Sequence, residues 1–109
     1  MEEGLLKYFE REEFIDELRI QLEKDIEGSN EVLEGAKINS FEKIYDLLIP
    51  LIEERVKDSV RWMRLINRVD LNERQLRNLG SMEGTYIEKM TKAILMRVFQ
   101  KVALRWAHK

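Results

Sequence analysis

The chain has 109 residues, of which 44% are hydrophobic and 37% charged, and its formal net charge is −2. This composition is typical of one globular domain and excludes the disordered class, in which apolar residues are scarce. Because the chain has no cysteine, it can form neither disulfides nor thiolate metal sites. We therefore expect one domain over residues 1–109. We also expect a cytoplasmic location, because the acidic residues after Met1 do not resemble the basic start of a signal peptide.

The two halves of the chain carry opposite charge. Residues 1–54 contain 16 acidic and 6 basic residues, a balance of −10, whereas residues 55–109 contain 5 acidic and 13 basic residues, a balance of +8. Such a division indicates either a charged partner or packing of the acidic half beside the basic half, within one molecule or across a dimer. The packing explanation is favoured because the chain as a whole is not basic.

The first half of the chain predicts one long helix and a short one. One proline and five glycines leave little material for turns, which favours a few long helices. Residues 5–27 have helical periodicity, with a strip of acids beside the apolar side. The strip consists of Glu3, Glu10, Glu13 and Glu17. Gly28 begins a stop signal, and residues 31–37 could add one or two helical turns.

A central helix is predicted over residues 41–69, capped at its start by Asn39 or Ser40. Its stretch 44–52 is apolar nearly all round, which is typical of a helix that others surround. Pro50 lies inside that stretch and removes one helical hydrogen bond. A continuous helix kinked at Pro50 is favoured over a break, because Ile49 would be a poor cap for a second helix.

The remainder predicts a short helix at residues 71–79 and a long final one. Asp70 and Glu73 form a candidate capping box for the short helix, and Gly80 ends it. Thr85 and Glu88 form another such box for the final helix. The predicted fold is therefore all-α: a small antiparallel helical bundle of three long helices and one or two short ones.

Residues suited to catalysis are scarce. The lone His108 stands next to the last residue, so serine–histidine, cysteine–histidine and zinc constellations are excluded. No glycine-rich phosphate-binding loop is present. Paired glutamates leave a carboxylate-only Mg²⁺ site as an alternative. We predict no enzyme activity, no catalytic residue, no metal site and no cofactor.

A basic strip is the most specific feature of the sequence. Lys57, Arg61, Arg64 and Arg68 fall within about 60° of one helix face. Apolar residues lie on the other side of this helix, at Val56, Val60, Met63 and Ile66. Cations at this spacing repel one another, so an opposing charge is required. One hypothesis is pairing with Glu10, Glu13 and Glu17, in one molecule or across a dimer; the alternative is binding of nucleic acid phosphates.

The predicted function is that of a non-enzymatic helical interaction or assembly module, with a nucleic-acid-binding protein using the basic strip as the alternative. Trp62 and Trp106 are expected to anchor the core or an interface. A continuous helix over residues 41–69 would be about 43 Å long and would overhang so small a domain, which predicts a homodimer. Another protein is a further candidate partner, and no membrane is expected to be one.

Overall fold

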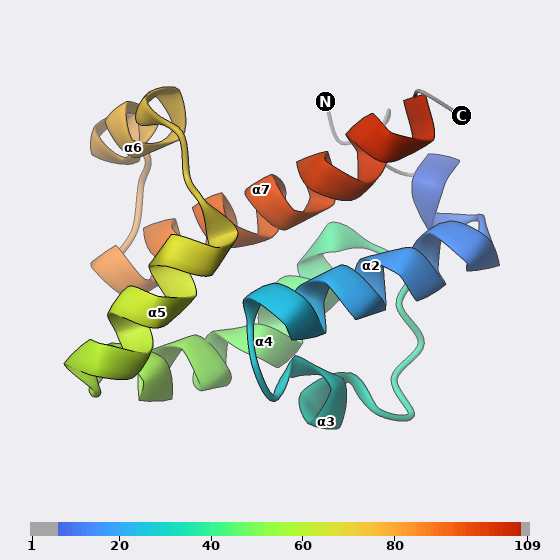
Figure 1. Cartoon of the computed structure of the whole chain (residues 1–109), viewed down its shortest axis with the longest axis horizontal. Helices are drawn as coiled ribbons and strands as arrows, with labels where there is room; N and C mark the ends of the chain where they lie inside the picture. Colours follow the sequence, from blue (N-terminus) through green and yellow to red (C-terminus); the bar gives the residue numbers. More distant parts are fainter. Residues whose placement is uncertain (1–6, 108–109) are drawn as a thin grey trace.

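The computed structural model describes residues 7–107 and confirms the all-α prediction (Figure 1). After a helical turn at residues 7–9, six α-helices and one 3₁₀ turn follow in the described chain. They are α2 (Glu12–Asp25), α3 (Ser29–Leu33), α4 (Phe41–Val56), α5 (Ser59–Val69), α6 (Glu73–Asn78), η1 (Leu79–Ser81) and α7 (Tyr86–Ala107). The Cα radius of gyration is 13.4 Å, close to the value of about 13 Å for a compact chain of this length.

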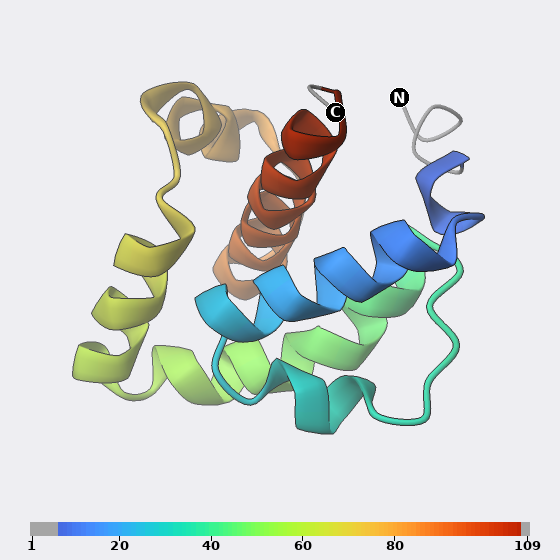
Figure 2. The same ribbon diagram turned by 45° about the vertical axis from the view of Figure 1, so that its right-hand side comes forward.

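The core is shared by α2, α4 and α7. Helix α7 contributes the most buried residues and packs against α2, α4 and α5. In Figure 2, α7 stands across α2 and α4, with α5 and α6 on its far side. Fully buried side chains from the three core helices include Phe14, Leu22, Leu48, Ile52, Ile94 and Val98. The centre of the fold is thus shared with α7, rather than held by residues 41–69 alone.

Several helix boundaries are where the sequence predicts them. The Ser40 hydroxyl caps α4 by accepting a hydrogen bond from the Lys43 N–H at 3.1 Å. At the start of α7, the Thr85 N–H donates to Glu88 Oε1 at 2.9 Å, and the Glu88 N–H donates to Thr85 Oγ1 at 3.2 Å. Helix α2 ends at Asp25, two residues before the predicted end, and Gly28 lies in the turn before α3 with a φ of 92°, a conformation that favours glycine. The short helix α3 begins at Ser29, within the predicted stop signal, and ends at Leu33, so the predicted bounds of residues 31–37 are wrong.

The predicted first helix is too long at its start. Arg11 has an extended backbone and separates the turn at residues 7–9 from α2. This break lets Tyr8 fold back onto Phe14 and Phe99, with ring centroids 4.6 and 5.5 Å apart. Aromatic packing therefore decides the boundary, and residues 5 and 6 lie outside the described part.

The predicted continuous helix over residues 41–69 is wrong. Pro50 does lie inside α4, with helical residues on both sides, but α4 ends at Val56 and α5 begins at Ser59. Asp58 makes this break, because its Oδ1 accepts hydrogen bonds from the N–H groups of Val60 and Arg61 at 3.1 and 3.2 Å. A kink at Pro50 and a homodimer stay predictions, but the overhang that suggested the dimer is absent.

The predicted capping box of Asp70 and Glu73 is wrong, because the observed box lies two residues later in the chain. Asp70 ends α5 in a left-handed conformation, with a φ of 57°. The box consists of Asn72 and Gln75: the Gln75 N–H donates to Asn72 Oδ1 at 2.8 Å, and the Asn72 N–H donates to Gln75 Oε1 at 3.0 Å. Asparagine accepts such a hydrogen bond as well as aspartate does, so both residues were suitable locally.

Candidate functional site

The basic strip lies on the solvent side of α5 and at the junction before it. Lys57, Arg61, Arg64 and Arg68 are all exposed. Among residues 7–107, the side chains of Lys57, Arg61 and Arg64 have no ion-pair partner within 4.0 Å. Three of the four predicted cations are therefore available to bind a partner in this structure.

Within the described part of the chain, the basic strip makes no ion pair with Glu10, Glu13 or Glu17. The ion-pair partner of the strip is Glu27, whose Oε2 lies 3.9 Å from Nη1 of Arg68. Both side chains are largely exposed, so this pair contributes at most about 1 kcal/mol. Glu17 instead accepts a hydrogen bond from the Trp106 indole N–H at 2.7 Å. The direction of α2 explains this: its carboxyl end approaches α5, whereas its early residues lie beside the end of α7 (Figure 1).

The carboxyl end of α2 offsets part of the positive charge. A small hollow there is lined by two carboxylates, four arginines and a leucine: Asp25, Glu27, Arg55, Arg61, Arg64, Arg68 and Leu65. Arg55 is buried, and its Nη2 donates to the Glu27 carbonyl oxygen at 2.7 Å. Helix carboxyl ends carry partial negative charge, so they stabilise nearby cations. Two carboxylates against four guanidinium groups still leave the hollow positive.

A buried ion pair behind this hollow joins three helices. Lys101 Nζ of α7 lies 2.8 Å from Asp25 Oδ2 of α2 and 3.0 Å from the Arg68 carbonyl oxygen of α5. Gln21 Nε2 donates to the second Asp25 oxygen at 3.2 Å. This pair was not predicted from the sequence. A signal was present, since Asp25 shares the apolar arc of the first helix with Leu18 and Leu22.

Both tryptophans pack against other aromatic rings. Trp62 is half-buried and meets the Tyr86 ring edge to face, with centroids 6.4 Å apart. Trp106 is half-buried and meets Phe14 at 5.5 Å, while the Arg11 guanidinium lies 5.6 Å from the centroid of its ring. Their contacts attach α5 and the end of α7 to the rest of the fold.

Exposed apolar residues on α5 are a feature that the sequence did not predict. Val60 and Met63 are 66% and 56% exposed, although their spacing suggested a buried face together with Val56 and Ile66. Only Leu65 and Val69 of α5 are buried, because α5 packs on the fold through one narrow side. Its outer side therefore combines free cations with two apolar side chains.

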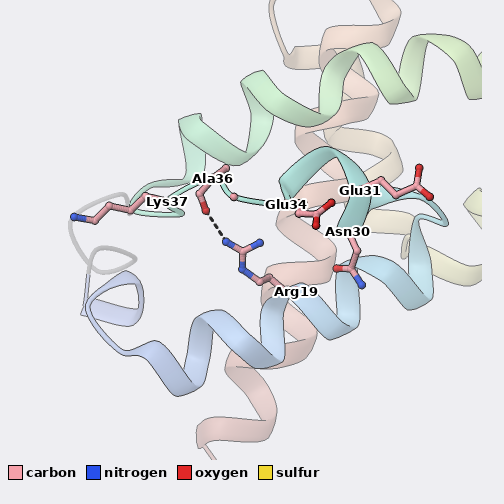
Figure 3. Close-up of a pocket in the computed structure, with 7 residues that line it drawn as sticks. Arg19, Asn30, Glu31, Glu34, Ala36 and Lys37 are labelled. Atoms are coloured by element: carbon pink, nitrogen blue, oxygen red, sulfur yellow. Dashed lines mark hydrogen bonds between the residues drawn. The ribbon is translucent and has the colours of Figure 1, made fainter.

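A second hollow lies between α2, α3 and the loop after α3 (Figure 3). Arg19 points into it and donates to the carbonyl oxygens of Leu33 at 3.1 Å and Ala36 at 2.7 Å. These hydrogen bonds satisfy carbonyl groups at the end of α3, which explains the position of the arginine. The remaining charged residues around the hollow, Glu31, Glu34 and Lys37, are exposed.

The two carboxyl groups with a lowered pKa, those of Glu23 and Glu88, belong to helix caps. Burial raises the pKa of Glu23, but hydrogen bonds from the N–H groups of Asn30 and Gly28 and from the Ser29 hydroxyl bring it below the usual 4.5 overall. Hydrogen bonds from Thr85 lower the pKa of Glu88.

Within residues 7–107, no group of three or more histidine, cysteine, aspartate or glutamate side chains is arranged to hold a metal ion. His108 lies outside this range.

No helix in the described part of the chain has the length and apolar character needed to cross a membrane. No protein-family profile matches the chain, and neither a curated protein nor a solved structure does so. The basic strip on α5 and at the junction before it is the most strongly charged exposed feature described above.

Proposed function

We propose that this protein is a non-enzymatic binding module and that the outer side of α5 contacts a negatively charged partner. One observation carries the proposal: Arg61 and Arg64 are exposed and have no ion-pair partner among the described residues, although they belong to a strip of four cations. Close cations repel one another, so an anionic partner would lower their free energy.

The placement of α5 supports this proposal. Asp58 caps the start of α5 at Ser59. The break before this cap separates α5 from α4, so the two helices need not share one axis. Leu65 and Val69 attach one side to the core, whereas Val60 and Met63 on the other side are 66% and 56% exposed. The helix is thus attached to the fold through one side while its charged side stays accessible to a partner.

Retention on immobilised heparin, a generic polyanion, tests the proposal. The variant Arg61→Ala/Arg64→Ala removes two cations from the basic strip. Its matched control is Arg74→Ala/Arg77→Ala, which removes two exposed cations from α6 and changes the net charge equally, from −2 to −4. We expect the α5 variant to elute at clearly lower salt than the control. Equal elution of the two variants, or no retention of the unaltered protein at low salt, contradicts the proposal.

Self-association is a second candidate function because Val60 and Met63 leave apolar surface uncovered on α5. A two-fold dimer covering these residues would give a particle of about twice 13.1 kDa by sedimentation equilibrium at micromolar concentration. Val60→Ser/Met63→Ser should then restore the monomer. A monomeric unaltered protein would exclude this second candidate and leave the proposal for the basic strip intact.

A further inference from the structure

We propose that the binding surface continues from α5 onto the last turns of α7 and that the phosphate backbone of double-stranded nucleic acid lies across it. This inference rests on the proposed function, because it names the partner of the same basic strip. The extended surface consists of the exposed cations Lys57, Arg61, Arg64, Arg68 and Arg105, with Lys101 behind it in an ion pair with Asp25.

Contacts between the helices make this surface continuous. Lys101 Nζ lies 3.0 Å from the Arg68 carbonyl oxygen, which places the α7 cation beside the end of α5. One turn further along α7, Arg105 Nη1 donates to Gln21 Oε1 of α2 at 2.8 Å. Gln21 in turn binds Asp25, the partner of Lys101. The cations of α5 and α7 therefore meet along the edge of α2, although they are more than 30 residues apart in the chain.

The balance of charge along this surface is positive. Its five cations lie near two exposed carboxylates, those of Glu27 and Asp58, while the buried Asp25 is neutralised by Lys101. Glu27 is exposed, but it lies 3.9 Å from Arg68 and offsets only part of the charge of the strip. At the far end, the Glu17 carboxylate binds the Trp106 indole and bounds the surface. A row of cations that spans two helices suits the regularly spaced charges of a nucleic acid backbone.

A duplex fits the surface better than a single strand. Proteins that bind single strands stack bases on accessible aromatic rings. Here Trp62 and Trp106 are half-buried and meet neighbouring rings edge to face. The surface thus offers charge for phosphates but no open pair of stacking rings, which favours backbone contacts without base readout.

The test is the salt dependence of binding to a short random-sequence DNA duplex, measured by fluorescence anisotropy. Each phosphate contact contributes about −0.9 to the slope of log affinity against log salt, so five contacts give a slope of about −4.5. Arg61→Ala/Arg64→Ala should flatten the slope by about two units. Arg105→Ala should flatten it by about one unit, whereas its matched control Arg77→Ala should leave it unchanged. Circular dichroism checks that each variant is folded.

The outcomes separate this inference from the proposed function. If Arg105→Ala binds with the unaltered slope while Arg61→Ala/Arg64→Ala does not, the extension onto α7 is wrong and the α5 site stands. If heparin retention depends on Arg61 and Arg64 but the duplex does not bind, the duplex assignment is wrong. Tighter binding of single-stranded DNA, polyglutamate or phosphatidylserine vesicles than of the duplex also overturns the assignment and identifies the other class of partner.

Discussion

Replacing Lys101 by methionine should destabilise the fold strongly. The side chain of Lys101 is 19% exposed and that of its partner Asp25 is 6% exposed, so the pair is largely removed from water. Methionine preserves the apolar stem of the lysine but cannot donate to Asp25 or to the Arg68 carbonyl oxygen. The substitution therefore leaves a buried carboxylate with Gln21 as its remaining hydrogen-bond donor among the described residues.

The expected loss is about 3 kcal/mol of unfolding free energy. A charge-assisted hydrogen bond contributes about 1.5–3 kcal/mol, and the lost bond to the Arg68 carbonyl oxygen adds about 1 kcal/mol. Breaking a fully buried pair costs about 3–5 kcal/mol. Lys101 is partly exposed, and Gln21 still donates a hydrogen bond to Asp25, so the expected loss of unfolding free energy lies near the lower end of this range. For a domain of this size, such a loss lowers Tm by about 12 °C.

Urea denaturation followed by circular dichroism measures this loss. Lys24→Met is the matched control, because Lys24 is exposed on α2, and it should change stability by less than about 0.5 kcal/mol. A double-mutant cycle with Asp25→Ala isolates the pair and should give a coupling of about 2 kcal/mol. A loss no larger than that of the control, together with zero coupling, would refute the reasoning.

Two further substitutions test individual elements. Pro50→Ala should raise the unfolding free energy by about 1–3 kcal/mol, because alanine restores the N–H that can reach the Asp46 carbonyl within α4; a fall in the urea midpoint would contradict this. Glu23→Gln should cost about 1 kcal/mol at pH 7, because the Glu23 carboxylate caps the start of α3. The folded-state pKa of Glu23 lies below 4.5, so its contribution is present above that value and is lost as the pH falls through the lowered pKa. The stability difference from the unaltered protein should therefore shrink in acid; a constant difference down to pH 2 would refute this assignment.

The sequence by itself determined the class of fold and several helix ends. Helical periodicity and the scarcity of proline and glycine predicted an all-α chain, and all elements of the described part are helical. Ser40 and the Thr85–Glu88 pair mark helix starts correctly, and Gly28 lies in the turn between α2 and α3. These features could be predicted because a cap acts on N–H groups within three or four residues, so its chemistry is complete within a short stretch of chain.

The division of residues 41–69 into two helices required the tertiary structure. Asp58 is a good cap, but the spacing of Arg61, Arg64 and Arg68 with Lys57 also fits an unbroken helix. Both local solutions are acceptable, so long-range packing decides between them. The break lets Leu65 and Val69 join the core beside α2 and α7.

Part of the candidate site could likewise be predicted from the sequence, and part required the tertiary structure. Spacing placed Arg61, Arg64 and Arg68 on one face of α5, because positions three and four apart in a helix share a face. Lys57 lies in the junction before α5, so the prediction that it shares a helix face with them was wrong. Their surroundings could not be predicted from spacing. Arg68 and Glu27, which form one ion pair, are 41 positions apart in the sequence. Asp25 and Lys101, which form the other, are 76 positions apart. Such contacts depend on where α2 ends relative to α5 and α7, which burial of the apolar faces of all three helices determines together.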